Sequence, residues 1–166
     1  MESLAVWFAA HLGDRISAEA VVFLVSLVPI LECRGGLLVA SLLKVDLWKA
    51  IPLVIAGNVL PVPFLLLFLK RMFLLLHRIP PVRGLVEKLE QRAANKSKAL
   101  AKGEFLGLLL FVGIPLPGTG GWTGSMVAAL MEMKIPKAMG AIALGVLLAT
   151  IIMSIVSYGL LGMLIS

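Results

Sequence analysis

Charged residues are scarce in this chain. Asp, Glu, Lys and Arg make up 14% of its 166 residues, against about 25% in soluble globular domains. Apolar residues make up 60% of the chain, and its mean hydropathy is +1.06. A globule of this size cannot bury so much apolar surface. The composition therefore excludes the water-soluble classes and predicts an integral membrane protein.

Cysteine and histidine are almost absent, which removes several kinds of chemistry. The single cysteine, Cys33, excludes an intramolecular disulfide framework and a cysteine-based zinc site. The two histidines, His11 and His77, lie far apart and form no ligand pattern. No metalloprotease, serine-hydrolase or kinase signature is present. We therefore expect no metal and no other cofactor, and we expect that the protein is not an enzyme.

Four long apolar stretches dominate the sequence. Residues 50–69 and 138–166 carry no charge and are long enough to cross a bilayer as helices, which takes about 20 residues. Residues 20–43 and 105–131 are each interrupted near the middle by proline and glycine, which cannot continue a helix. Broken backbone at membrane depth needs cover from protein or from a water-filled cavity. We predict two re-entrant helical hairpins here, with their tips near the membrane midplane; two kinked spanning helices are the alternative.

The two halves of the chain resemble each other. An alignment without gaps, offset by 88 positions, pairs identical residues: Pro29 with Pro117, Gly36 with Gly124, Lys49 with Lys137 and Gly57 with Gly145. Each repeat contains a hairpin, a short polar turn and a spanning helix. Because a hairpin does not cross the membrane and a helix crosses once, the second repeat is predicted to be inverted. We place repeat 1 at about residues 18–69 and repeat 2 at about 104–166, in one membrane domain.

Basic residues are concentrated between the repeats. Nine of the 15 lysines and arginines lie in residues 70–102. Membrane proteins carry basic loops on the cytoplasmic side, so we predict that residues 70–103 form a basic cytoplasmic linker with a short helix. This linker is expected to contact anionic lipids and no nucleic acid. Spaced apolar side chains in residues 1–13 predict a short amphipathic N-terminal helix on the membrane surface.

Glu32 and Arg34 are the only charged residues inside the four apolar stretches, and they stand at the predicted tip of the first hairpin. A charge at membrane depth is costly and is a candidate functional group. We interpret both as substrate-binding residues and Glu32 also as the coupling residue. The alternative is a self-neutralising ion pair that only holds the loop, although apolar packing would serve that purpose as well.

The second predicted tip is rich in glycine and threonine. Glycine amides in a turn form a concave anion site, and the returning arm adds a positive helix N-terminus. Together with Arg34, this tip favours a carboxylate or a phosphate. Small residues that let helices pack closely are the alternative. Asn58 lies mid-span and either lines the cavity or bonds across helices. The candidate binding residues of the second tip are Pro117, Gly118, Thr119, Gly120, Gly121, Trp122 and Thr123.

Two segments resemble the paired motifs of the small multidrug export protein family. They are an acidic-x-Arg-Gly tip at residues 32–35 and a Pro-x-Pro-Gly-Thr-Gly tip at residues 115–120. The resemblance implies a transporter in the cytoplasmic membrane of a prokaryote. More distantly, the layout is similar to that of DedA-type proteins and of a second polyprenyl-phosphate translocase family. Both have inverted repeats and re-entrant hairpins, and both are linked to recycling of an anionic lipid carrier.

Three functions remain open on these grounds. The first is a transporter or flippase for an anionic substrate, such as a polyprenyl phosphate, bound at Arg34 and the glycines of the second tip. The second is a proton-coupled exporter of cationic compounds through Glu32, which Arg34 disfavours because it repels a cation. The third is a non-transporting structural or assembly membrane protein. Two spanning helices and two hairpins are few to enclose a cavity, so we expect a homodimer or higher homo-oligomer among membrane lipids.

Overall fold

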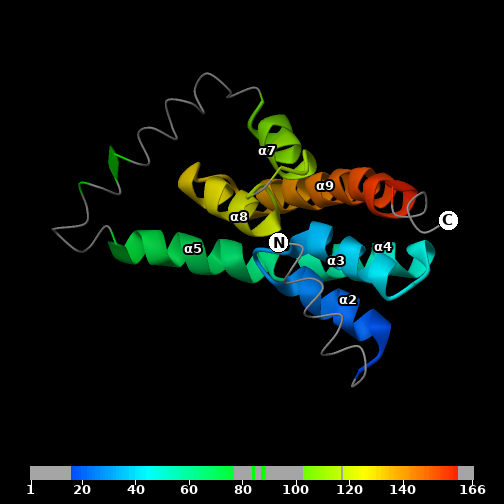
Figure 1. Cartoon of the computed structure of the whole chain (residues 1–166). Coiled ribbons are helices and arrows are strands. Elements are labelled where there is room, and N and C mark those ends of the chain that lie inside the picture. Colours follow the sequence, from blue (N-terminus) through cyan, green and yellow to red (C-terminus); the bar gives the residue numbers. More distant parts are fainter. Residues whose placement is uncertain (1–15, 77–83, 85–86, 89–102, 117, 161–166) are drawn as a thin grey trace.

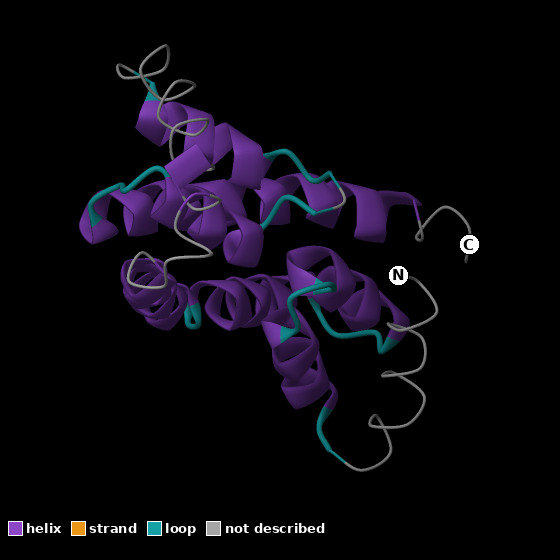
Figure 2. Ribbon diagram, turned by 90° about the vertical axis from the view of Figure 1, so that its left-hand side faces the viewer, coloured by secondary structure: helices purple, strands orange, loops and turns teal. Residues whose placement is uncertain are grey.

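The computed structural model describes residues 16–76, 84, 87–88, 103–116 and 118–160. Every regular element in this part of the chain is helical, as predicted (Figure 2). The first half contains α2 (Ala18–Leu27), α3 (Glu32–Leu42), α4 (Leu47–Val59) and α5 (Val62–Leu76). The second half contains α7 (Glu104–Gly113), α8 (Gly121–Leu130), α9 (Ile135–Ser154) and its π-helical extension η1 (Ile155–Leu160). The predicted N-terminal helix and about two thirds of the basic linker lie outside the described residues, and residues 70–76 of the predicted linker belong to α5.

The helices of both predicted hairpins break at prolines. Val28, which precedes Pro29, leaves the helical region with φ −71° and ψ 127°. Ile114, which precedes Pro115, does the same with φ −81° and ψ 116°. A proline clashes with a helical conformation of the residue before it, which explains both breaks. The four arms that result contain 10 or 11 residues, and each is about 15 Å long.

Two helices are long and apolar enough to cross a membrane, Leu47–Phe73 and Ile135–Gly159. They support the assignment to membrane proteins. The expected membrane-length helix over residues 50–69 is present within Leu47–Phe73, and a turn at Leu60 and Pro61 divides it into α4 and α5. Pro61 lacks an amide hydrogen and cannot bond to the preceding turn. The backbone of Leu60 stays helical, with φ −56° and ψ −42°, and α5 continues roughly along the direction of α4 (Figure 1).

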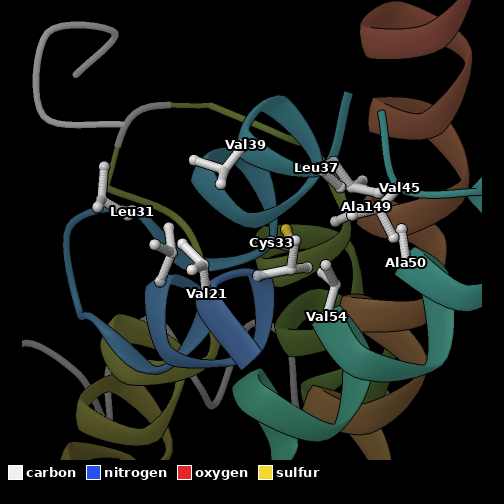
Figure 3. Close-up of a cluster of buried hydrophobic side chains, with 12 residues drawn as sticks. Val21, Leu31, Cys33, Leu37, Val39, Val45, Ala50, Val54 and Ala149 are labelled. Carbon is white, nitrogen blue, oxygen red and sulfur yellow. The ribbon is translucent and has the colours of Figure 1, made fainter. Parts of the chain in front are cut away.

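Each long helix packs against both halves of the molecule. The first buried cluster consists of α2, α3 and α4, and Ala149 of α9 completes it (Figure 3). The second consists of α7, α8 and α9, and Val62 and Leu66 of α5 complete it. The helix that begins in one half therefore ends in the buried cluster of the other half.

The two long helices run in opposite directions. Tyr158, near the end of η1, donates a hydrogen bond of 2.8 Å to the carbonyl of Val45, just before α4. Lys70, near the end of α5, donates to the carbonyl of Met133, just before α9. The end of each long helix thus lies beside the beginning of the other.

The turns before the long helices have the same geometry in both halves. The left-handed residue is Lys44 in the first turn and Glu132 in the second, with φ of 54° and 52°. In each turn the next amide donates to the carbonyl five residues earlier, at 2.9 Å in the first half and 3.0 Å in the second. Lys44 and Glu132 are paired by the same offset of 88 positions that pairs the identical residues.

Glycines at paired positions allow close contacts between helices. A Cβ added at Gly57 of α4 would lie 2.8 Å from the Cβ of Ser26 in α2. A Cβ added at Gly145 of α9 would lie 2.7 Å from the Cβ of Val112 in α7. Real Cβ atoms need more space than this, so glycine is required for each long helix to approach the first arm of its own hairpin.

Candidate functional site

The loop between α2 and α3 meets the loop between α7 and α8, and we call these loops the first and the second tip. Oε1 of Glu32, at the beginning of α3, accepts a hydrogen bond of 3.3 Å from the backbone amide of Trp122, at the beginning of α8. Nη2 of Arg34 donates to the carbonyl and to the hydroxyl oxygen of Thr119, at 2.7 and 3.0 Å. The charged pair from the first tip therefore contacts the polar loop of the second tip.

Glu32 holds an unusual backbone conformation. Its φ is +47°, in the left-handed region that costs a residue with a side chain about 1–2 kcal/mol. Its side chain is 6% exposed, and a Cβ added at Gly120 would overlap its carboxylate. Because Gly120 has no side chain, the carboxylate reaches the N-terminus of α8, where the helix dipole favours an anion.

Arg34 binds a loop that is closed by its own hydrogen bonds. The hydroxyl oxygen of Thr119 lies 2.8 Å from the carbonyl oxygens of both Ile114 and Leu116. It also accepts a hydrogen bond from the amide of Leu116 at 3.2 Å. No ion pair joins Arg34 to Glu32 in the described part of the chain, since the two side chains contact different parts of the second tip. The pair thus connects the two tips instead of closing one of them.

The start of α8 is held from two sides. The amide of Gly120 donates to the hydroxyl oxygen of Thr123 at 2.9 Å. On the other side, a Cβ added at Gly121 would lie 3.3 Å from the carbonyl oxygen of Asn58, a residue of α4. Asn58 is 1% exposed and donates from Nδ2 to the carbonyl of Val54 at 3.3 Å. The middle of the first long helix therefore lies at the N-terminus of α8.

Three buried polar atoms of these residues have no hydrogen-bond partner. They are the donors Nε of Arg34 and Nε1 of Trp122, and the acceptor Oδ1 of Asn58. Buried polar groups without a partner are rare in native structures and cost about 1–3 kcal/mol each. A polar ligand that carries both acceptors and donors would supply hydrogen-bond partners for all three atoms.

The structure brings together nearly all the residues singled out in the sequence. Glu32 and Arg34 contact Thr119 and Trp122, Asn58 adjoins Gly121, and Thr123 accepts from Gly120. Gly118 lies in the same loop with φ +82°. Pro117 lies outside the described residues. Within those residues, no group of three or more His, Cys, Asp or Glu could hold a metal ion.

The anion position at the second tip differs from the expectation in one respect. The glycines and the N-terminus of α8 were predicted to receive a substrate anion, and here they hold the carboxylate of Glu32. Sequence reasoning also missed Lys70 and Tyr158, which join the halves at their outer ends. An alignment that scores identities could not find them, because they occupy paired positions but differ in chemistry.

The sequence pattern of one protein family matches residues 32–152 of the chain, and that family is described as "Putative small multi-drug export protein". The match spans both tips and more than half of the chain, so the chain belongs to this family. A search of curated proteins found no match, and a search of solved structures found none either. The family name denotes export, which is the task of a membrane transporter and not of an enzyme.

Proposed function

We propose that this protein is a flippase-type transporter that moves an anionic, lipid-linked substrate such as a polyprenyl phosphate. The observation that carries the proposal is the contact between Glu32 and the N-terminus of α8. The amides at a helix N-terminus bind phosphate and carboxylate groups by the same interaction. A substrate phosphate would take this position when Glu32 leaves it. Glu32 then acts both as an internal substitute for the substrate and as the coupling residue.

The proposal includes re-entrant hairpins in two inverted repeats. The antiparallel long helices support the inversion. The ion pair of 3.0 Å between Lys137 and Glu104 supports a hairpin that enters and leaves at one end, because it joins the beginning of α9 to the beginning of α7. Arms of about 15 Å would reach the middle of a hydrocarbon core of about 30 Å. The basic linker after α5 lies on the cytoplasmic side in this proposal.

The chemistry of the tips supports a phosphate. The guanidinium of Arg34 matches phosphate geometry, and its Nε is buried without a partner. Nε1 of Trp122 offers a second buried donor, and Oδ1 of Asn58 could accept from a phosphate hydroxyl. A lipid-linked phosphate suits so small a site, because its tail stays in the bilayer and only the headgroup enters between the tips.

A second candidate, proton-coupled export of cationic compounds, is favoured by one observation. Glu32 is almost fully buried, and the contacts described for its carboxylate include one long hydrogen bond. A buried carboxylate with so little compensation is suited to take up a proton or a cation. Arg34 opposes this function, since its positive charge on the same tip repels a cation.

Lipid binding by the purified protein tests the proposal. Native mass spectrometry in mild detergent would compare farnesyl phosphate with farnesol, which has the same tail but no charge. We expect the wild type to prefer the phosphate and Arg34→Ala to bind it about tenfold more weakly, as the loss of a charge-assisted hydrogen bond predicts. Lys49→Ala is the matched control, because it removes the same charge from an exposed position at the start of α4.

Each other outcome favours a different function. Equal binding of farnesol and farnesyl phosphate by the wild type would overturn the anionic substrate. Binding of a cationic dye that is lost in Glu32→Gln would establish the second candidate. Undiminished activity of the double variant Glu32→Gln/Arg34→Gln in cells would support a structural or assembly role in place of transport.

We further propose that the protein is a homodimer or larger homo-oligomer whose subunits cover each other's tips. Ile30 and Leu116, at the outer edges of the two tips, are 64% and 56% exposed. Leu116 itself belongs to the non-helical backbone of residues 114–116. Lipid does not cover irregular backbone at membrane depth, because it offers no hydrogen bonds. A second copy of the chain would supply the cover that the tips need.

A further inference from the structure

Two hydrogen bonds at opposite ends of the molecule are related by the internal repeat. In one, Tyr158 donates to the carbonyl of Val45; in the other, Lys70 donates to the carbonyl of Met133. The offset of 88 positions pairs Lys70 with Tyr158 and also pairs Val45 with Met133. The repeat thus relates the two donors to each other and the two acceptors to each other. Each half donates one hydrogen bond to the same backbone position of the other half.

Each bond closes the far end of a contact between the halves. We call the contact of α3 with the end of α9 and η1 the α3–α9 seam, and the contact of α8 with α5 the α5–α8 seam. Both seams begin at the meeting tips, since α3 carries Arg34 and α8 begins at Gly121. The α3–α9 seam ends at Tyr158 and the α5–α8 seam ends at Lys70. Each seam therefore extends from the tips to one end of the molecule.

We propose that Tyr158 and Lys70 are gate latches, positioning residues that hold the two seams shut and release them in alternation. This inference rests on the proposed transport function. When the Tyr158 latch opens, the tips face the side where α9 ends; when the Lys70 latch opens, they face the side where α5 ends. Both latches donate to a backbone carbonyl in a turn. Movement of that turn therefore breaks the hydrogen bond, and no second side chain has to change.

The hydrogen bonds of the two latches differ in strength. The two seams can therefore open separately. Lys70 donates from a charged group, and such hydrogen bonds are stronger than neutral ones. The α3–α9 seam has a neutral donor, but it adds a contact of 3.4 Å from the hydroxyl of Ser41 to the carbonyl of Ser157. The paired positions in the α5–α8 seam are Ala129 and Leu69, which are apolar. One seam is thus closed by a single charged donor and the other by two neutral ones.

Chemical labelling of Cys33 would report how accessible the tips are. This residue is the only cysteine, it stands between Glu32 and Arg34, and it is 4% exposed. A membrane-impermeant maleimide would be applied to sealed vesicles of each orientation. We expect Tyr158→Phe to raise Cys33 labelling about fivefold from the side where α9 ends, and Lys70→Met to raise it about tenfold or more from the opposite side, because the lysine bond is charge-assisted. This is the population change expected from the loss of one hydrogen bond.

Two control variants separate the latches from general loosening. Lys70→Arg keeps a cationic donor and should label like the wild type. Ser154→Ala removes a buried hydroxyl that bonds only within α9, to the carbonyl of Thr150, and should also leave labelling unchanged. Chromatographic size and circular dichroism would show that each variant is folded.

The latches and the proposed function can fail separately. Unchanged labelling in both latch variants, or an equal rise from both sides, would overturn the latches even if farnesyl phosphate binding is intact. Side-specific labelling combined with no preference for farnesyl phosphate over farnesol would retain the latches and overturn the anionic substrate.

Discussion

At the scale of single residues, the contact between the tips depends on Gly120. A side chain there would overlap the Glu32 carboxylate, and forcing the two apart costs about 1–3 kcal/mol. We expect Gly120→Ala to lower the free energy of unfolding by that amount in a detergent melt. Adding Glu32→Gly should restore much of the loss, because it removes both the carboxylate and the strain of a positive φ.

Gly107→Ala is the matched control for Gly120→Ala. Gly107 lies in α7, and a Cβ added there meets nothing within 4 Å. Alanine is the better helix former by about 1 kcal/mol, so this variant should be as stable as the wild type or slightly more so. Equal stability of the two alanine variants would show that the close approach of Glu32 to Gly120 is not a constraint.

The sequence predicted which residues of the site matter but not how they pair. Glu32 and Arg34 stood out because charge is rare in apolar stretches. Their separate contacts with Trp122 and Thr119 depend on how two hairpins meet, and no local pattern encodes that. The positive φ of Glu32 also has no local signal, because glutamate is not a residue that favours this conformation.

At the scale of elements, α9 contains two glycines in opposite environments. Gly145 faces the Cβ of Val112 and the backbone of Leu109, at 2.7 and 2.8 Å from an added Cβ. Gly140 meets only the ring of Phe105, at an ordinary 3.5 Å. We expect Gly145→Ala to destabilise the protein by about 1–3 kcal/mol, and Gly140→Ala to be neutral or stabilising by up to about 1 kcal/mol. Thermal unfolding of both variants checks this, and a reversed order would contradict the packing of α7 on α9.

Local rules located some element boundaries and missed another. The breaks at Pro29 and Pro115 were predicted because proline and glycine together cannot continue a helix, and each break falls at the residue before the proline. The turn at Pro61 has a different cause, because Leu60 before it stays helical and the proline only lacks the amide hydrogen that would bond to the preceding turn. The lengths of the two tip loops do not follow from the positions of the prolines, since each loop is closed by hydrogen bonds of its own, such as those from Leu31 to Val28 and from Thr119 to Leu116.

At the scale of the whole molecule, the proposed oligomer can be tested at the tips. Leu116, at the second tip, and Leu75, near the end of α5, are both 56% exposed. In a Cys33→Ala background, a short thiol cross-linker should join subunits through Leu116→Cys and not through Leu75→Cys. Stronger cross-linking at position 75, or a single-copy mass in native mass spectrometry, would contradict mutual cover of the tips.

The overall architecture was predictable only in outline. Hydropathy indicated a membrane protein, and the offset of 88 positions indicated two related halves. The sequence did not indicate that Val62 and Leu66 pack in the second half while Ala149 packs in the first. Such apolar residues are interchangeable in pattern, so hydropathy alone cannot assign them to a cluster.

The exchange of helix ends between the halves has a consequence for biogenesis. A ribosome that has completed α5 has made residues whose protein partners, in α8 and α9, do not yet exist. Lipid must surround that face of α5 until the second half is synthesised and displaces it. The first half alone therefore lacks part of its packing, and a chain severed in the linker should recover that packing when the two pieces are co-expressed.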